Sequence, residues 1–481
     1  MKGQNMPKVA VIGAGPGGYT AAFYAADLGM EVVLIDRAPN PGGVCLYRGC
    51  IPSKALLHAA QVKREAAAAS DFGLTFGEPS LDLGKLRDWK RGIVDRLTSG
   101  LGALCKSRNI TYIQGEANFT SKNSLAVSTS AGGHEEISFD SAIVATGSRP
   151  ASLPFLPNDS PRVMSSTNAL ELEEIPGKLL VLGGGYIGLE LGTVYAEFGS
   201  EVTVVEMEKG ILPGVDRDLV RPLAKRLEKS IARFLLNTRV VKVTEQEDGL
   251  LVEFEGAKAP AEPVLYDRVL VSVGRVPWTK GLGLEAAGLG TNAQGFIDVD
   301  EKRCTQNPAI YAIGDVTGQP MLAHKASHEG RVAVDAIAGE NVSFAPAAIP
   351  AVIFTDPEIA WAGLSETEAK ANKIAVEVVR FPWAASGRAM SIDRTEGLTK
   401  LLVEPETQRI LGAGIVGSHA GELIAEATLA IEMAATIDDL RMTIHAHPTL
   451  SETVMEAAEA FLGFATHSHR PKRGARGKQG K

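Results

Sequence analysis

A glycine-rich pattern occurs twice in the chain and limits the folds that are open to it. Each copy reads as a short buried strand, the sequence Gly-x-Gly-x-x-Gly, a helix, and a second strand that ends at an acidic residue. The copies run from Val9 to Asp36 and from Leu179 to Glu206, and in both the third glycine precedes the acid by 18 residues. This order and spacing are typical of dinucleotide-binding βαβ units.

Each part of the pattern has a physical purpose. The glycines permit a tight turn and a close approach of the backbone to a pyrophosphate, the helix N-terminus stabilises the phosphate charge, and the acid accepts hydrogen bonds from ribose hydroxyls. One copy could be a chance set of glycine turns, but two complete copies make that alternative weak. The sequence therefore predicts two dinucleotides, held by Gly13, Gly15, Gly18 and Asp36 and by Gly183, Gly185, Gly188 and Glu206.

Three later segments read as strands that end in glycine. They run from Ala142 to Gly147, from Val269 to Gly274 and from Ala309 to Gly314, the last followed by Asp315. A length of 481 residues suggests about three domains. Beyond an Ala/Pro-rich segment, alternating strands and helices predict a final α+β unit.

Charge and hydropathy disfavour nucleic acid and membrane partners. The formal net charge is −8, so the bulk of the protein should not seek polyanions. The uncharged run from Val9 to Ala26 contains four glycines and a proline, which indicate a turn and not a membrane span. Residues 470–481 hold six basic residues and no acid, and we interpret them as a solvated tail and not a docking arm. With no secretory or transit signal, we expect a cytoplasmic protein of bacterial type, or an organellar chain whose leader has been removed.

Two cysteines, Cys45 and Cys50, follow the first glycine pattern closely. In a regular helix their Cα atoms would lie about 8.6 Å apart, beyond the roughly 7 Å limit for a disulfide. A bridge therefore requires a distorted helix, which Gly49 permits. The alternatives are two buried thiols or half of a zinc site, but no second cysteine pair or other metal-ligand spacing completes the latter. A redox-active pair is favoured, and we interpret Cys105 and Cys304 as structural.

Near the C-terminus, His447 is followed five residues later by Glu452. If the chain folds back, the carboxylate would orient the imidazole as a base. Dithiol oxidation needs such a base, because the thiolate attacks and an unperturbed thiol has a pKa of about 8.5. The alternative is an ordinary satisfied histidine, which is our interpretation of His445. The bond from His447 to Pro448 is a candidate cis peptide.

Together, these motifs resemble the pyridine nucleotide–disulfide oxidoreductases, over residues Lys8 to about Gly463. The segment Cys-Leu-Tyr-Arg-Gly-Cys-Ile-Pro-Ser-Lys, from Cys45 to Lys54, is similar to that family's active disulfide, and its ending is closer to the members that oxidise dihydrolipoamide than to glutathione reductases. His-Pro-Thr-x-x-Glu, from His447 to Glu452, resembles the family's catalytic motif. The chain departs from the usual pattern at Asp36, Tyr47, Arg48 and Trp278.

The resemblance implies a cofactor for each glycine pattern. The first, with Asp36, would bind FAD and the second, with Glu206, would bind NAD. Glu206 repels the 2′-phosphate of NADP, and the neighbouring Met207 and Glu208 offer no arginine to neutralise it. By position, the further FAD residues would be Lys54, Ala117, Thr146, Gly147, Asp315 and Ala323, and the further NAD residues would be Val240 and Gly274.

The resemblance also implies an α/β fold with two Rossmann-like domains, for FAD and NAD, and a C-terminal α+β dimerisation domain. The expected order is an FAD domain in 1–150, an NAD domain in 151–275, a segment completing the FAD domain in 276–347, the dimerisation domain in 348–465 and the basic tail in 466–481. A homodimer is implied, in which His447 of one subunit acts at the disulfide of the other.

The implied reaction converts dihydrolipoamide and NAD⁺ to lipoamide and NADH, as part of 2-oxo acid dehydrogenase or glycine cleavage complexes. A substrate thiolate would attack Cys45, Cys50 would lie nearer the flavin, and Lys54 would pair with Glu190 beside it, although this pair could be a scaffold ion pair. One alternative is reduction of glutathione, a related disulfide or mercuric ion. Another is an FAD- and NAD-binding scaffold or redox sensor, but that predicts loss of a catalytic element and none is missing.

Overall fold

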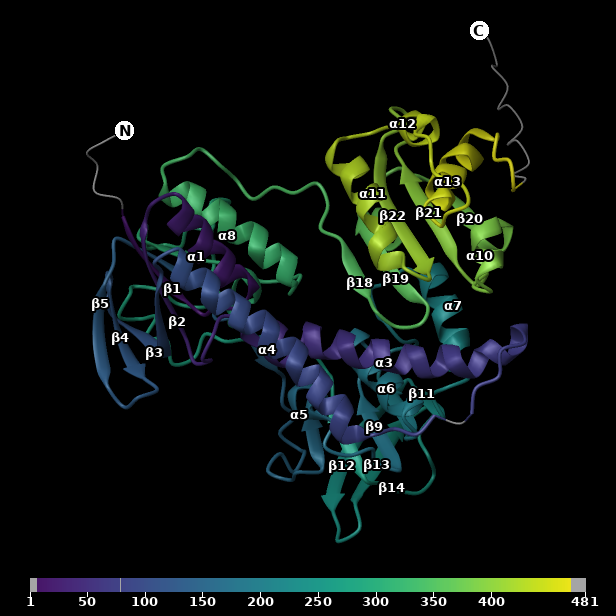
Figure 1. Ribbon diagram of the computed structural model, residues 1–481, viewed down its shortest axis with the longest axis horizontal. Coiled ribbons are helices and arrows are strands. Elements are labelled where there is room, and N and C mark those ends of the chain that lie inside the picture. Colours follow the sequence, from purple (N-terminus) through teal and green to yellow (C-terminus); the bar gives the residue numbers. More distant parts are fainter. Residues whose placement is uncertain (1–6, 78, 469–481) are drawn as a thin grey trace. The chain divides into compact units, whose positions relative to one another are not determined.

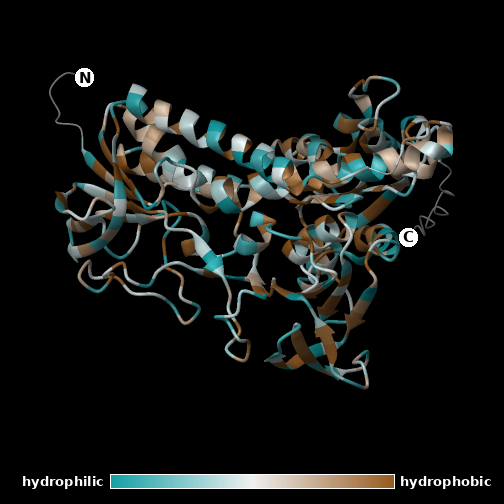
Figure 2. Cartoon of the chain, turned by 60° about the horizontal axis from the view of Figure 1, so that its bottom comes forward, coloured by the Kyte–Doolittle hydropathy of each residue, from teal (hydrophilic) through white to brown (hydrophobic). Residues whose placement is uncertain are grey.

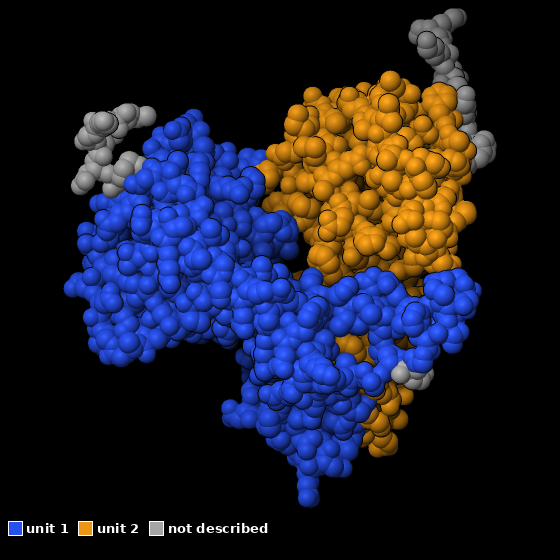
Figure 3. All heavy atoms as spheres, viewed as in Figure 1, with its two compact units in different colours: residues 1–177, 242–251, 265–345 blue, residues 178–241, 252–264, 346–481 orange. Residues whose placement is uncertain are grey.

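The computed structural model describes residues 7–77 and 79–468. They form two compact units, coloured separately in Figure 3, which we describe one at a time. Unit 1 comprises residues 1–177, 242–251 and 265–345, and unit 2 comprises residues 178–241, 252–264 and 346–481. The predicted domain boundaries stay predictions, and the predicted tail lies outside the described residues from position 469 onward.

Unit 1 is built on a seven-stranded sheet in the order β17-β6-β1-β2-β3-β4-β5 (Figure 1). The pairs from β17 to β3 are parallel, and β4 and β5 extend the sheet in antiparallel fashion. The strands are β1 (Lys8–Ile12), β2 (Glu31–Asp36), β3 (Thr111–Ser121), β4 (Ser124–Thr129), β5 (His134–Ser138), β6 (Ser141–Val144) and β17 (Ile310–Ala312).

Side chains alternate across this sheet, and both of its faces are buried. On β1, Val9 and Val11 join one hydrophobic cluster, whereas Ala10 and Ile12 join another, as expected of a parallel sheet covered on both sides. The unit's remaining elements are α1 (Pro16–Asp27), α2 (Gly43–Arg48), α3 (Cys50–Ala68), η1 (Ala69–Phe72), α4 (Leu83–Ser107), β7 (Ser148–Pro150), β8 (Val163–Ser165), α5 (Ser166–Glu171), β15 (Arg268–Val271), β16 (Arg275–Pro277), η2 (Gly314–Thr317) and α8 (Ala323–Ile337).

Unit 2 contains a parallel arrangement of β11, β10 and β9, in which α6 follows β9. Its C-terminal part is an antiparallel sheet in the order β18-β19-β22-β21-β20. Helices α7 and α11 pack on β19 and β22, and α13 packs on β20 and β21. The elements are β9 (Lys178–Leu182), α6 (Tyr186–Glu197), β10 (Glu201–Glu206), α7 (Arg217–Leu227), β11 (Arg233–Leu236), β18 (Ala351–Ile353), β19 (Glu358–Gly363), α9 (Glu366–Ala371), β20 (Glu377–Pro382), η3 (Trp383–Ala385), α10 (Gly387–Ser391), β21 (Leu398–Val403), β22 (Ile410–Gly417), α11 (Ala420–Glu432), α12 (Ile437–Met442) and α13 (Glu452–Leu462).

The predicted fold class is confirmed: each glycine pattern lies between a strand and a helix, and an α+β segment ends the chain. Figure 2 shows hydrophobic residues along many of the strands. Strands β12 (Thr238–Glu245), β13 (Leu250–Gly256) and β14 (Val264–Tyr266) complete the described elements. The uncharged run near the N-terminus forms β1, a turn and α1, and among the described residues we find no helix with the length and apolar character needed to span a bilayer.

Candidate active site and cofactor sites

The two glycine turns have the same backbone geometry. Gly13 has φ +98° and Gly183 has φ +99°, a region that glycine adopts without strain. Gly15 and Gly185 are the N-cap residues of α1 and α6, and neither helix has a side-chain cap. Each turn therefore presents a helix N-terminus whose first amides suit a phosphate.

The first turn is closed behind by neighbouring backbone, and both turns are open in front. A Cβ on Gly18 would lie 1.9 Å from the Gly13 oxygen, and one on Gly13 would lie 2.4 Å from the Ala145 oxygen. By contrast, a Cβ on Gly185 would meet no described atom within 4 Å, and one on Gly15 would meet only a Cα at 4.0 Å. This cradle fits a pyrophosphate at both helix starts, because the backbone can approach the ligand closely there.

The acids that end β2 and β10 hold these turns in place. Asp36 accepts hydrogen bonds from the Ala14 amide at 2.7 Å and the Ala38 amide at 2.9 Å. Glu206 accepts equivalent bonds from the Gly184 amide at 2.8 Å and from the amide two residues beyond itself at 2.9 Å. The sequence predicted that these carboxylates bind ribose, but their bonds to the backbone become visible only in the fold.

The other residues predicted to bind FAD also belong to unit 1. Thr146 Oγ1 donates to the carbonyl of Trp278 at 2.7 Å, and Ser148 Oγ donates to Asp315 at 2.5 Å. The structure therefore connects Trp278, where the chain departs from the family pattern, to a predicted FAD residue. Ala117 lies on β3, Thr146 and Gly147 follow β6, Asp315 lies in η2, Ala323 begins α8 and Lys54 lies in α3.

Arg217 lies close to the predicted NAD turn but is already engaged. Its guanidinium donates to the carbonyls of Ile211 and Val215 at 2.8 and 2.7 Å and to that of Leu212. It therefore has little capacity to bind a 2′-phosphate, which supports NAD over NADP. Of the remaining predicted NAD residues, Val240 lies on β12 and Gly274 follows β15.

The helix breaks between the two cysteines, which is the distortion that a bridge between them would require. Helix α2 ends at Arg48 and α3 begins at Cys50, and the intervening Gly49 has φ −146° and ψ −116°. A Cβ at Gly49 would lie 2.8 Å from the Val44 oxygen. Glycine therefore permits the close chain crossing that brings Cys45 toward Cys50.

Cys45 and Cys50 are both thiols in the structure, and their side chains are hydrogen-bonded to each other. That hydrogen bond and burial raise the pKa of the Cys45 thiol, while the Lys54 ammonium opposes the shift. Two sulfur groups in contact at the broken start of a helix are positioned for thiol–disulfide exchange.

His447 and Glu452 meet, because the chain folds back just before α13. The Nδ1 of His447 lies 2.9 Å from Oε1 of Glu452, and the Thr449 amide donates to Oε2 at 2.7 Å. Although burial opposes it, the bonds from Thr449 and His447 lower the pKa of Glu452. An ionised carboxylate can only accept a hydrogen bond, so it favours the ring tautomer with the hydrogen on Nδ1, which leaves Nε2 as the basic atom. The His447 side chain is 74% exposed, so Nε2 is accessible on this unit.

Two further predictions concern the chain close to this pair. The His447–Pro448 bond is cis, as expected. The His445 side chain is 5% exposed, and its ring nitrogens lie 2.6 Å from Glu426 Oε1 and 3.0 Å from the Thr443 oxygen, which fits the predicted structural role.

The predicted pair of Lys54 and Glu190 stays a prediction, because the two residues belong to different units. Lys54 Nζ lies 3.4 Å from Ser53 Oγ. Glu190 is buried on α6 and accepts a hydrogen bond from the Phe354 amide at 2.9 Å. Likewise, the cysteines lie in unit 1 and the His447–Glu452 pair in unit 2.

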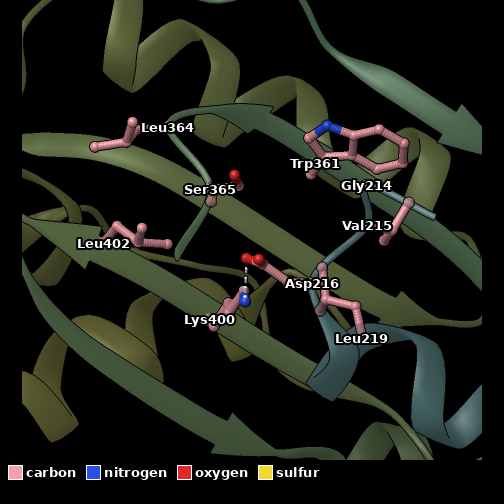
Figure 4. A pocket seen from close by; sticks show the side chains of 10 residues that line it. Gly214, Val215, Asp216, Leu219, Trp361, Leu364, Ser365, Lys400 and Leu402 are labelled. Carbon is pink, nitrogen blue, oxygen red and sulfur yellow. Dashed lines mark hydrogen bonds and ion pairs between the residues drawn. The ribbon is translucent and has the colours of Figure 1, made fainter. Parts of the chain in front are cut away.

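One charged cluster was not found by sequence reasoning. Lys400 is 1% exposed, and its Nζ donates to Asp216, Asp218 and Glu366 at 2.7, 2.8 and 2.9 Å. Figure 4 shows the contact with Asp216 at one wall of a small pocket. Despite opposing burial, hydrogen bonds from Lys400 and Thr367 lower the pKa of Asp216 to about 2. The three acids could ligate a metal ion by their spacing, but the ammonium group already lies among them.

These folds and sites define a nucleotide-dependent disulfide oxidoreductase. The family model described as "Pyridine nucleotide-disulphide oxidoreductase" matches residues 7–330, and the dimerisation domain of the same family matches residues 349–458. The chain belongs to this family and carries its dimerisation domain. FAD and NAD(H) are the cofactors of the family, which agrees with the two glycine turns.

Curated relatives identify the particular member that this chain resembles. It is 51% identical over 459 residues to the dihydrolipoyl dehydrogenase of Vibrio parahaemolyticus, covering 95% of this chain and 96% of that protein. It is 49% identical to the dihydrolipoyl dehydrogenase of Haemophilus influenzae, with the same coverage. The dihydrolipoyl dehydrogenase of Haloferax volcanii is 44% identical over 461 residues, covering 95% of this chain and 97% of that one.

Solved structures show the same fold. LpdA from Mycobacterium tuberculosis aligns with a TM-score of 0.88 and 28% identity, over 94% of this chain and 99% of that one. The flavoprotein disulfide reductase RclA from Escherichia coli aligns with a TM-score of 0.83 and 30% identity, with the same coverage.

Proposed function

We propose that the chain is a dihydrolipoyl dehydrogenase that oxidises dihydrolipoamide to lipoamide and passes the electrons to NAD⁺. The observation that carries this proposal is the helix break between Cys45 and Cys50, where a Cβ at Gly49 would lie 3.3 Å from the Cα of Cys45. The relatives of that name at 44–51% identity over nearly the whole chain support the choice of substrate.

The cofactor cradles support the electron path. The turn at Gly13 to Gly18, with Asp36, would hold the FAD, and the turn at Gly183 to Gly188, with Glu206, would hold the NAD. Bound FAD supplies a two-electron acceptor that the dithiol pair can reduce and that can reduce NAD⁺. The chain's own task is to deliver those two electrons from the substrate to the Cys45–Cys50 pair.

The exchange begins from the oxidised pair, in which the two cysteine sulfurs form a disulfide. Nε2 of His447 removes a proton from one substrate thiol, and the resulting thiolate attacks Sγ of Cys45. The disulfide bond breaks, and Cys50 leaves as a thiolate. The second substrate thiol then attacks the substrate sulfur of the mixed disulfide, which releases lipoamide and leaves both cysteines reduced.

Glu452 acts through His447 in this scheme. By accepting a hydrogen bond from Nδ1–H, Glu452 fixes the imidazole with Nε2 toward the substrate, and its negative charge stabilises the imidazolium that forms when Nε2 takes the substrate proton. Lys54, in the turn after Cys50, would stabilise the thiolate and the reduced flavin, paired with Glu190.

We further propose that the active site is shared between two subunits, with His447 of one acting at the cysteines of the other. The dimerisation domain supports this. The substrate would be dihydrolipoamide carried on the lipoyl domains of a 2-oxo acid dehydrogenase or glycine cleavage complex, in the cytoplasm.

The test is a substrate panel with purified holoenzyme. We expect NADH formation from dihydrolipoamide, little reaction with NADP⁺, and little reduction of glutathione disulfide. Cys45→Ser should abolish turnover, whereas Cys105→Ser, a change at a buried cysteine in α4, should preserve it. Full lipoamide turnover by Cys45→Ser would refute the exchange scheme, and inactivity with every dithiol would favour a binding scaffold.

A further inference from the structure

The predicted NAD turn rests on the loop that joins β10 to α7, residues 207–216. The Leu212 amide donates to the Gly184 carbonyl at 2.8 Å, and the Gly184 amide in turn donates to Glu206. A Cβ on Gly184 would lie 3.2 Å from a methyl of Ile211. Because the loop packs directly on the second residue of the turn, a displacement of the loop would displace the turn and its acid.

One residue of the loop, Leu212, is held in an unfavourable backbone conformation. The Leu212 residue has φ +52° and is buried, and a non-glycine residue persists in this region only where its surroundings impose the conformation. Arg217 imposes it, because its guanidinium ties together the carbonyls of Ile211, Leu212 and Val215. Arg217 is the first residue of α7, so the position of its guanidinium depends on how the start of that helix is fixed.

That start is fixed by the C-terminal sheet. Asp216, the N-cap residue of α7, accepts bonds from Lys400 Nζ at 2.7 Å, from the Thr367 hydroxyl at 2.7 Å and from the Glu366 amide at 2.9 Å. Lys400 lies on β21, and Figure 4 shows it reaching Asp216 from that sheet. The contacts therefore run without interruption from Lys400 through Asp216, Arg217 and the loop to the glycine turn, all within unit 2.

We propose that Lys400 is a positioning residue for NAD binding, which rests on the proposed function of the Gly183–Glu206 turn. Arg380 also bonds to Asp218 and Glu366, but among the described residues Lys400 is the one cation bonded to Asp216. Without its ammonium group, the Asp216 carboxylate has no positive partner beside two other acids in a partly buried site. The start of α7 then moves, the hydrogen bonds from Arg217 to the loop carbonyls weaken, and the Gly183–Gly188 turn loses its fixed geometry. NAD affinity falls, while the exchange at Cys45 proceeds as before.

The test compares Lys400→Met with Arg394→Met in the FAD-loaded enzyme. Arg394 is a matched control, because it is also largely buried in the C-terminal part of unit 2 but bonds to Asp356 and Glu396. We expect Lys400→Met to raise the KM for NAD⁺ about three- to tenfold with little change in kcat or in the KM for dihydrolipoamide. The Kd for ADP-ribose, measured by calorimetry, should rise by the same factor. Arg394→Met should leave both values within about twofold.

The outcomes separate the inference from the function on which it rests. Unchanged NAD⁺ and ADP-ribose affinities in folded Lys400→Met would overturn the positioning role, and so would an equal loss in Arg394→Met. If Lys400→Met does not fold, Thr367→Val removes one side-chain bond to Asp216 and should weaken ADP-ribose binding in the same direction, with no change counting against the inference. A wild-type protein that neither reduces NAD⁺ nor binds ADP-ribose would instead refute the proposed function.

Discussion

The Nδ1 of His447 lies 2.9 Å from Oε1 of Glu452, and the second carboxylate oxygen is held by the Thr449 amide. The carboxylate therefore cannot rotate away from the ring without losing a backbone hydrogen bond. This arrangement fixes the ring tautomer and directs Nε2 outward, which is what a thiol base requires.

Glu452→Gln should lower kcat for dihydrolipoamide about 10- to 100-fold, a part of the ~10²–10⁴ that a positioned base supplies. The amide keeps the shape of the side chain but not the charge that stabilises a protonated ring. The pH profile of kcat should change with it, whereas cofactor content should not. Glu426→Gln, at the partner of His445, is the control, and an equal effect there would count against a special role for Glu452.

Gly49→Ala tests the helix break between the cysteines. The new methyl would lie 2.8 Å from the Val44 oxygen, so the crossing must open, at a cost of about 1–3 kcal/mol in the free energy of unfolding. The rate at which the Cys45–Cys50 disulfide re-forms, measured by thiol titration, should fall because the sulfurs lie farther apart. Gly100→Ala in α4 meets no described atom within 4 Å and should stabilise by up to about 1 kcal/mol. Equal stability and equal rates of disulfide formation in the two variants would contradict the steric interpretation of Gly49.

Local patterns in the sequence predicted the parts of the site whose residues are neighbours in the chain. The strand, turn and helix of each glycine pattern, the break at Gly49 and the fold-back from His447 to Glu452 all depend on steric and hydrogen-bonding rules that act over a few residues. In the first pattern, α1 begins at Pro16, because proline suits the first helical position.

The cluster around Lys400 could not be predicted in the same way. Lys400 and Asp216 are 184 positions apart, and only the packing of α7 on the C-terminal sheet brings them together. A lysine in a strand is ordinarily assigned to a solvated face. Its burial becomes intelligible once three carboxylates are seen to surround it, and no local motif announces that arrangement.

Paired changes at the two acids should separate the cofactors. Glu206→Ala removes a ribose acceptor and the anchor of the Gly184 amide, so the KM for NAD⁺ should rise about tenfold or more, at about 1.5 kcal/mol or more per charged hydrogen bond lost, while FAD content stays normal. Asp36→Ala should instead lower the FAD content, so that less flavin is retained per chain after gel filtration, and should leave the KM for NAD⁺ nearly unchanged. Flavin absorbance and NAD⁺ kinetics on the same samples provide the measurement, and loss of the same cofactor in both variants would contradict the assignment.

The contribution of Asp216 to the free energy of unfolding should decrease at acid pH. Its pKa is lowered from an ordinary 3.8 to about 2 in the folded protein, so the stabilisation is fully present above pH 3.8 and is lost as the pH falls through about 2. The difference in free energy of unfolding between wild type and Asp216→Asn should therefore be constant from pH 6 to about 4.5 and should shrink below about 3.8. Urea unfolding at each pH measures it. Asp335→Asn, at an acid that accepts a bond from Tyr24, is the control, and a difference for Asp216→Asn that grows on acidification would show that its carboxylate is not held ionised by Lys400.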